Sequence, residues 1–174
     1  MRDILITKNV VYGSERKTKD MEKFILRKFR NRYIFNKRII QERIKIVSKF
    51  ISNKKILLYT RNKNFEEIVK NFAEALKIKN YVGRFLPGTF TNPQIDDYYE
   101  ADAVFVLNPK TDKRAIKEAT IANIPVIAIC NSDDVTSNID IVIPANNKSK
   151  ASISVIFNLL LKNISPSIEI SELK

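Results

Sequence analysis

Two glycines with the spacing of a phosphate-binding loop are the first candidates for chemistry in this sequence. Gly83 and Gly88 stand in the stretch GRFLPGTFTNP, residues 83–93, with four residues between them. A nucleotide-binding loop of this kind has a lysine and a hydroxyl residue directly after its second glycine, which reach the terminal phosphates and hold magnesium. Thr89 follows Gly88 here, so the lysine is missing, and Pro87 removes one backbone N–H that would cradle an oxygen. The stretch therefore predicts no nucleotide ligand.

The same stretch has the residues of a rigid turn. Pro87-Gly88 suits a type II turn, in which the glycine has a positive φ angle. Arg84 adds a planar cation that fits phosphate or carboxylate partners. Two interpretations stay open: a preformed surface that docks on another macromolecule, or an ordinary connection between sheet elements. The docking surface would comprise Gly83, Phe85, Pro87, Gly88, Thr89, Thr91 and Asn92.

Other groups that could do chemistry are few. The chain has no histidine, which removes the usual acid–base shuttle and the common zinc sites. Its single cysteine, Cys130, lies in the apolar run VIAIC and reads as a small buried hydrophobic residue. Carboxylates near predicted strand ends can hold magnesium, but we expect caps, turn formers or solvated charges at Asp96, Asp97, Glu100, Asp102, Asp133 and Asp134. We predict no catalytic residue, no metal site and no cofactor.

The elements that must position these residues alternate between strands and helices. Continuously apolar strands are expected at 55–60, 103–107, 125–130 and 140–143. Amphipathic helices are expected at 37–51, 112–122 and 149–162. A further helix should begin near Asn64, which forms a capping box with Glu67. Residues 76–81 read as the end of a helix. This alternation is typical of a parallel sheet covered on both faces, and predicts a single doubly wound α/β domain with a mostly parallel sheet.

We expect three parts along the chain. Residues 1–32 read as a basic N-terminal segment with a short helix at 21–28, residues 33–164 as the α/β domain with a first short strand at 33–35, and residues 165–174 as a mobile tail. No apolar run approaches the roughly 20 residues that span a bilayer, and the start has no secretory signal. The single cysteine excludes a disulfide framework, so we expect a cytoplasmic protein.

Positive charge is concentrated in one region. The net charge is +12, yet residues 1–63 hold 19 Lys and Arg against 5 Asp and Glu, whereas residues 64–174 hold 12 against 14. Such asymmetry indicates a polyanionic partner, either nucleic acid or an anionic membrane surface. The candidate RNA-binding residues are Lys17, Lys19, Arg27, Lys28, Arg30, Arg32 and Arg38, together with Arg84 and Lys148.

Several blocks of the sequence resemble one known family. These are GRFLPGTFTNP, VLNPKTDKRAIKEA, NIPVIAICNSDD and IDIVIPANNK, with KTKDMEKFI and ERIKIVSKF upstream. They are similar to the universal small-subunit ribosomal protein two family, in its archaeal and eukaryotic form, also called the SA or laminin-receptor-precursor type. The resemblance implies a flavodoxin-like domain on the small ribosomal subunit, without catalysis, in contact with small-subunit ribosomal RNA and neighbouring ribosomal proteins.

Two rival functions remain beside this one. The first is a doubly wound enzyme that binds a nucleotide or a sugar phosphate at the carboxyl ends of its strands. The second is a module that binds membrane surfaces or polyanions without specificity. Ligand titration separates the first rival, and comparison of folded ribosomal RNA with anionic vesicles separates the second.

Overall fold

The centre of the molecule is a five-stranded parallel sheet. The computed structural model describes residues 4–164, and its strands lie in the order β4-β3-β5-β6-β7. Every neighbouring pair is parallel. Counted from β3, this is the strand order 2-1-3-4-5 of flavodoxin-like folds, which confirms the predicted doubly wound α/β domain. The strands are β3 (Ile56–Thr60), β4 (Lys79–Val82), β5 (Ala103–Val106), β6 (Val126–Cys130) and β7 (Ile141–Pro144).

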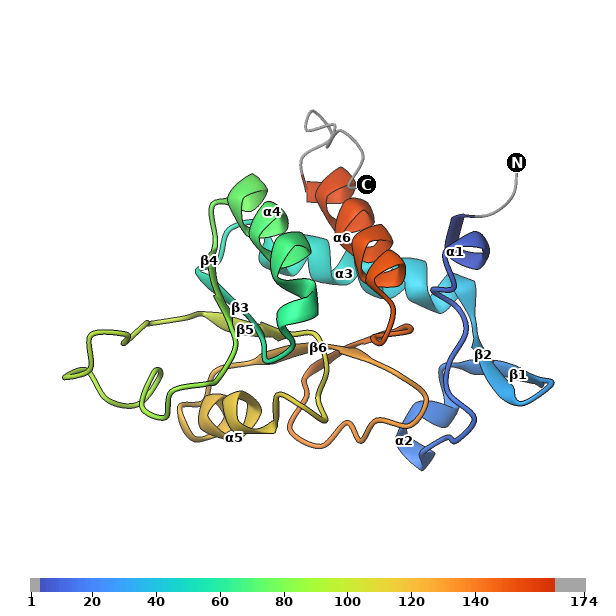
Figure 1. Cartoon of the computed structure of the whole chain (residues 1–174), viewed down its shortest axis with the longest axis horizontal. Helices are drawn as coiled ribbons and strands as arrows, with labels where there is room; N and C mark the ends of the chain where they lie inside the picture. The colour runs from blue at the N-terminus through green and yellow to red at the C-terminus, as the bar shows by residue number, and fades with distance from the viewer. Residues whose placement is uncertain (1–3, 165–174) are drawn as a thin grey trace.

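Helices cover the two faces of the sheet unequally. On one face lie α3 (Lys37–Ile51), α4 (Glu66–Leu76) and α6 (Lys150–Ile164), and on the other lies α5 (Lys113–Ile121) (Figure 1). α6 contacts both α3 and α4, so the three helices share one layer. The helix predicted at 37–51 has the bounds of α3. Its apolar stripe packs into the core and comprises Ile40, Ile44, Val47 and Ile51.

Apolar strands and aromatic side chains make up the core. All residues of β3, β5 and β6 are buried, as expected for strands covered on both faces. Phe157 of α6 stacks on Phe72 of α4, with ring centres 4.1 Å apart, and meets the ring of Phe105 edge-on at 5.9 Å. These aromatic contacts join α4 and α6 to the sheet. No helix in the described part of the chain is long and apolar enough to cross a membrane.

The N-terminal region departs from the sequence prediction. The helix predicted at 21–28 is wrong, because α2 spans only Lys19–Glu22 and the next element is a strand, β1 (Ile25–Phe29). β1 pairs antiparallel with β2 (Arg32–Phe35), which confirms the strand expected at 33–35. The residues Met21, Phe24 and Ile25 do have helical spacing. Cross-strand hydrogen bonds satisfy the backbone after Phe24, and this tertiary pairing overrides the local signal.

The hairpin also bears on the expected division of the chain. β1 lies before residue 32 and β2 contains it, so paired strands span the boundary expected between the basic segment and the α/β domain. A single turn of helix, α1 (Ile4–Thr7), precedes both and contacts α6. The tail expected at 165–174 lies outside the described residues.

Two further local predictions need correction. Residues 76–81 were expected to end a helix, but α4 ends at Leu76 and Lys79–Val82 forms β4, an edge strand whose half-exposed residues lack a continuous apolar run. Asn64 does not cap α4, whose N-cap position is Phe65, and the capping side chain is that of Asn62, one turn earlier. The Asn62 side chain accepts a hydrogen bond from the Asn64 N–H at the start of a 3₁₀ turn, Lys63–Phe65, that leads into the helix.

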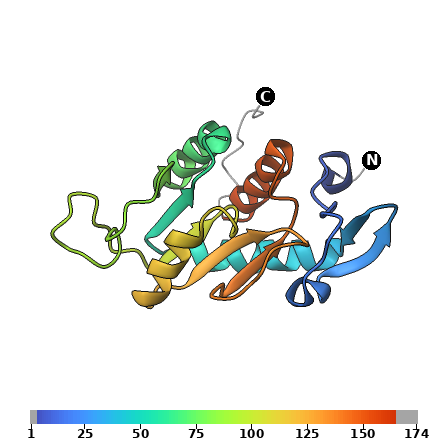
Figure 2. The ribbon, with the colours of Figure 1, turned by 60° about the horizontal axis from the view of Figure 1, so that its bottom comes forward.

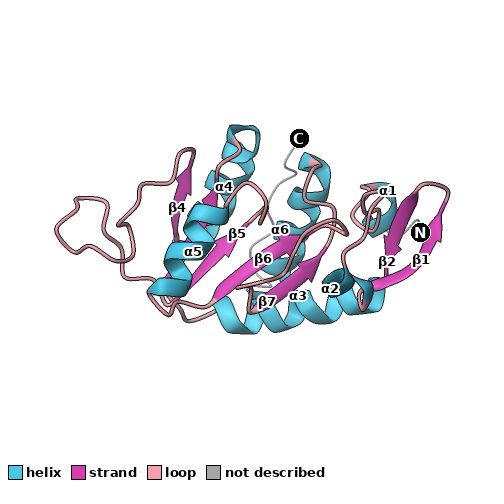
Figure 3. Ribbon diagram, turned by 90° about the horizontal axis from the view of Figure 1, so that it is seen from below, coloured by secondary structure: helices cyan, strands magenta, loops and turns pink. Residues whose placement is uncertain are grey.

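Two segments project from the sheet and helices at opposite ends of the long axis (Figure 1). The β1–β2 hairpin forms one projection, and the connection between β4 and β5, residues 83–102, forms the other. Figures 2 and 3 show the same separation from other sides. The cations predicted in the N-terminal region and the loop that carries Arg84 therefore do not form one continuous surface.

Candidate nucleic-acid interface

The β1–β2 hairpin, residues 25–35, carries four of the predicted cations and is called the basic hairpin below. Phe29 pairs with Arg32, which leaves a two-residue turn of Arg30 and Asn31. Arg30 has a φ of +51°, a left-handed conformation that is uncommon outside glycine and asparagine. The four cations are exposed, and none makes an ion pair with another residue of the described range 4–164: Arg27, Lys28, Arg30 and Arg32.

Aromatic rings lie between these cations. Phe29 is 49% exposed, and the guanidinium groups of Arg27 and Arg30 lie 6.0 and 5.5 Å from its ring centre. The ammonium groups of Lys28 and Lys17 lie 5.4 and 5.9 Å from the ring centre of Tyr33. A ring flanked by cations can stack on an unpaired base while its neighbours contact phosphates.

Hydrogen bonds fix the segment before the hairpin to the carboxyl ends of β6 and β7. The Ser14 N–H donates to Ser132 Oγ at 2.8 Å, and that hydroxyl donates to the Arg16 carbonyl at 2.9 Å. Thr18 donates from its N–H to the Ser132 carbonyl at 2.9 Å. A Cβ atom on Gly13 would lie 2.8 Å from Ser132 Oγ, so a larger residue here would displace the Ser132 side chain and its hydrogen bonds. The basic hairpin thus has a fixed orientation relative to the sheet.

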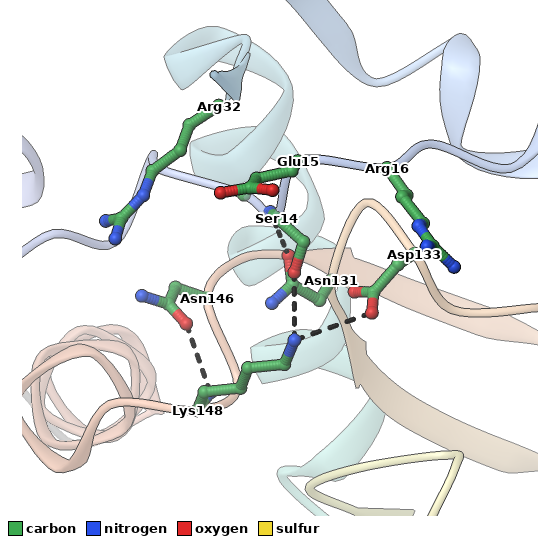
Figure 4. Close-up of a pocket in the computed structure, with 9 residues that line it drawn as sticks. Ser14, Glu15, Arg16, Arg32, Asn131, Asp133, Asn146 and Lys148 are labelled. Carbon is green, nitrogen blue, oxygen red and sulfur yellow. Dashed lines mark hydrogen bonds and ion pairs between the residues drawn. The ribbon is translucent and has the colours of Figure 1, made fainter. Parts of the chain in front are cut away.

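A polar cavity of about 520 Å³ lies where this segment meets the sheet (Figure 4). The Lys148 ammonium donates to Ser14 Oγ at 3.0 Å and lies 3.4 Å from Asp133 Oδ2. Partial burial acts to raise the pKa of Asp133, but hydrogen bonds from Lys110 and Ser14 and the charge of Lys148 bring it below its ordinary value. Arg16, Arg32 and Glu15 also line the cavity (Figure 4), and the Asp133 carboxylate is already paired with Lys110 and Lys148.

The remaining predicted cations differ in their availability. Lys17 pairs with Glu22, and the hydrogen bond that its ammonium donates to the Glu22 carboxylate raises the pKa of Lys17, so part of its charge is already compensated. Lys19 lies on α2 and Arg38 in the first turn of α3, and both are exposed. The structure brings Arg32 and Lys148 together at the polar cavity, although 116 positions separate them in the sequence.

A buried carboxylate holds the Gly83–Pro93 loop. Glu118 of α5 accepts hydrogen bonds from the N–H groups of Gly88 at 2.9 Å and Phe90 at 2.8 Å. Thr91 Oγ1 lies 3.3 Å from the same carboxylate. Backbone amides that converge in this way form an anion-binding concavity. The side chain of Glu118 fills that concavity, so the loop offers no cradle to a phosphate.

The predicted docking loop has an inner and an outer part. Gly88 has a φ of +99°, as the turn prediction requires. Phe85 and Thr89 are buried, and the Phe85 ring lies 5.2 Å from that of Tyr59 in the core. Gly83 is buried as well. The outer part, which a partner could reach, comprises Arg84, Leu86, Pro87, Thr91 and Asn92.

Two of the acidic candidates, Asp102 and Asp134, bind backbone N–H groups as caps or turn formers. Asp102 accepts from the Lys55 N–H at 2.7 Å at the start of β3. Asp134 accepts from the Asn131 N–H at 2.7 Å and from the Asn147 amide at 2.8 Å, and burial raises its pKa. Within the described residues no three acidic or cysteine side chains are grouped closely enough to hold a metal ion.

Sequence reasoning missed Glu118 and Ser132. A signal existed for Glu118, because it shares the buried helical face of Ala115 and Ala119, where an unpaired charge is costly. No local signal links Ser132 to Ser14, since they are 118 positions apart and meet only through the fold.

Comparisons with known proteins agree with this architecture. Residues 96–167 match the family model of ribosomal protein S2. The small ribosomal subunit protein uS2 of Methanococcus maripaludis strain C5 is 35% identical over 164 residues, which cover 92% of this chain and 74% of that protein. The same protein from strain C6 is 34% identical over the same coverage.

The chain belongs to the ribosomal protein S2 family. This membership makes it a ribosomal protein of the small subunit, as the resemblance implied. It also excludes the rival interpretation as a doubly wound enzyme, because the S2 family is structural and not enzymatic.

Proposed function

We propose that this S2-family protein is a structural component that binds small-subunit ribosomal RNA through its basic hairpin. Arg27, Lys28, Arg30 and Arg32 neutralise phosphates, and Phe29 stacks on an unpaired base. Lys19, Arg38 and Lys148 extend this contact along the same end of the molecule. The protein works in the cytoplasm as part of the subunit.

The basic hairpin is the observation that carries this proposal. It projects from the sheet and helices (Figure 2), and a two-stranded hairpin is at most marginally stable alone. Its strands expose Leu26 by 62% and Phe29 by 49%. Exposed apolar side chains beside unpaired cations suit a partner that offers both base surfaces and phosphates.

Neighbouring ribosomal proteins are the second class of partner that we propose. The outer part of the Gly83–Pro93 loop presents Leu86, Pro87 and Asn92 on a backbone that Glu118 and the turn at Gly88 hold in place. A preformed loop loses little conformational entropy on binding. This suits a fixed contact within an assembly.

A membrane-surface module is the rival that shares these features, since cations beside apolar residues also suit anionic lipid. The basic hairpin is short and strand-like, however, and lacks an amphipathic helix that could lie in a lipid interface. Titration of the purified chain with folded small-subunit ribosomal RNA and with phosphatidylserine vesicles decides between them. We expect saturable binding to the RNA at salt concentrations that abolish vesicle binding.

Fractionation of a native lysate tests the function in the cell. We expect the unsubstituted chain to co-migrate with small ribosomal subunits on a sucrose gradient. Replacement of Arg27, Lys28 and Arg30 by Gln should move the chain to the top of the gradient, while its melting temperature stays close to that of the unsubstituted protein. An unsubstituted chain that sediments free of subunits would refute the proposal.

A further inference from the structure

A second group of cations lies at the carboxyl ends of β3 and β5, away from the basic hairpin. The chain runs from β3 outward to β4 on one side and later to β5 on the other, so the strand order reverses here. Open α/β sheets place their ligands in the crevice at this position. A pocket of about 230 Å³ opens there, lined by Tyr59, Arg61, Arg84, Phe85, Thr111 and Arg114.

Three arginines from separate elements converge on this pocket. Arg61 directly follows β3, Arg84 follows β4, and Arg114 lies in the first turn of α5. All three are exposed, and within residues 4–164 none of them makes an ion pair. The adjacent carboxylate, Asp112, is buried and accepts from the Arg61 N–H at 3.0 Å and from Thr111 Oγ1 at 2.9 Å. The pocket lining therefore includes three positively charged guanidinium groups, while the nearby Asp112 carboxylate already accepts hydrogen bonds from its own neighbours.

Two tyrosines, the buried Tyr59 and the partly exposed Tyr81, fix the backbone that carries Arg84. Tyr59 donates from its hydroxyl to the Gly83 carbonyl at 2.9 Å, and Tyr81 donates to the Arg84 carbonyl at 2.9 Å. Burial raises the pKa of Tyr59 from 10 to about 12, so its hydroxyl stays protonated and donates this hydrogen bond even at alkaline pH. The wall that bears Arg84 is therefore formed before any ligand arrives.

The positive charges that line this pocket repel one another. The first turn of α5 contains Lys113 and Arg114 and no acidic residue, although the amino end of a helix favours negative charge. Arg61 and Arg84 add like charges to the same small volume. A bound anion would relieve both sources of repulsion.

We propose that this pocket, the arginine pocket, binds a phosphate group in the backbone of an RNA strand. Guanidinium groups pair with phosphate oxygens through two parallel N–H donors, which suits three arginines around one phosphate. Enclosed sites for whole small molecules typically measure about 300 Å³ or more, so the smaller volume favours a phosphate of a passing strand over a nucleotide. The inference rests on the proposed function for the identity of that strand, and adds an RNA contact separate from the basic hairpin.

The test compares two double variants of the full chain that lose the same charge. Arg61→Gln with Arg114→Gln alters the arginine pocket, while Lys49→Gln with Lys162→Gln alters α3 and α6 at exposed positions far from it in the fold. Fluorescence anisotropy with a single-stranded 5′-fluorescein RNA measures affinity across a salt series. We expect the pocket variant to bind about tenfold more weakly than the control, and its salt slope to fall by about 0.7 for each phosphate that it no longer neutralises.

Two further measurements locate the contact and identify its source. Protection from phenylglyoxal, read by mass spectrometry, should appear at Arg61 and Arg114 with the RNA, but not with inorganic phosphate or adenosine monophosphate at the same phosphate concentration. The pocket variant should also melt about 1–4 °C higher than the control, because it relieves the repulsion. Equal RNA affinities of the two variants would overturn the inference, and so would equal protection by adenosine monophosphate, which would indicate a phosphomonoester site.

This outcome is separate from that of the proposed function. The assay uses naked RNA and purified chain, whereas the function is judged by co-migration of the unsubstituted chain with subunits. A chain that co-migrates while its pocket variant binds RNA like the control refutes only the arginine pocket.

Discussion

Removal of the Glu118 carboxylate should release the Gly83–Pro93 loop and destabilise the protein. The carboxylate accepts hydrogen bonds from the N–H groups of Gly88 and Phe90, and Phe90 is buried beside it. Hydrogen bonds to a charged acceptor contribute about 1.5–3 kcal/mol each, and a buried donor left unpaired costs about 1–3 kcal/mol. We therefore expect Glu118→Ala to lower the free energy of unfolding by about 3–5 kcal/mol.

A more conservative change separates the charge from the shape. Glu118→Gln keeps one acceptor oxygen but turns an NH₂ group toward the second backbone N–H. Its expected cost is about 1–3 kcal/mol, because one donor loses its acceptor. Glu67→Ala on the exposed side of α4 is the control and should change stability by no more than about 0.5 kcal/mol.

Urea denaturation gives the free energies, and hydrogen exchange gives the location. In both Glu118 variants the amide protons of Gly88 and Phe90 should exchange faster than in the control, while those of β5 keep their protection relative to global stability. If Glu118→Ala costs no more than Glu67→Ala and exchange at the two amides is unchanged, other contacts hold the loop and our account of it is wrong.

Four further outcomes test other parts of the account. Binding to ribosomal RNA should weaken roughly a thousandfold between about 50 and 200 mM salt if about six cations of the N-terminal surface contact phosphates, and a flat titration would contradict this. Phe29→Ala should cost about 1–3 kcal/mol of RNA binding, whereas Leu26→Ala on the same strand should cost less than half of that if stacking is the cause. Gly88→Val should lower both the melting temperature and the occupancy in subunits, because a Cβ would lie 2.5 Å from Ile95 Cδ1 at a φ of +99°. Arg84→Ala should lower only the occupancy. Normal occupancy of Arg84→Ala would mean that the loop is only a connection between sheet elements. Burial raises the pKa of Asp112 from 3.8 to about 6, so its stabilising contribution of about 3 kcal/mol is complete below pH 3.8 and is lost as the pH rises through 6. The free energy of unfolding, measured by urea denaturation between pH 4 and 7, should therefore fall with pH, and Asp112→Asn should remove this dependence. An unchanged dependence in the variant would mean that other groups cause it.

The sequence was sufficient to predict four of the five strands of the sheet and the helices that cover it. Continuous apolar runs mark strands that are buried on both faces, and three such runs became β3, β5 and β6. The stripe in α3 has the period of a helix with one buried face. Both patterns lie within a single segment of the sequence, so they can be recognised without knowledge of the fold.

The misplaced elements depend on pairing between strands. β4 lies at the sheet edge and buries little, so KNYV carries no apolar run. β1 forms because β2 is available to it, and its exposed face reads as the polar side of a short helix. In both cases the partner strand supplies the hydrogen bonds that decide the structure, and no single-segment pattern reports them.

The candidate site was predictable in charge but not in arrangement. Charge asymmetry identified the N-terminal cations, and the family resemblance named a partner. The position of Phe29 between Arg27 and Arg30 follows from the hairpin register, which the sequence did not predict. The convergence of Arg61 with Arg114 at the arginine pocket depends on the strand order, since β3 and α5 are far apart in the sequence.

Ultraviolet cross-linking of purified small subunits, followed by mass spectrometry of the RNA-linked peptides, tests the central claim most directly. Aromatic side chains stacked on bases cross-link efficiently, so the account predicts RNA adducts on the peptide of the basic hairpin, at Phe29 or Tyr33. Adducts confined to peptides of α4, which lies away from the hairpin along the long axis (Figure 1), would contradict it.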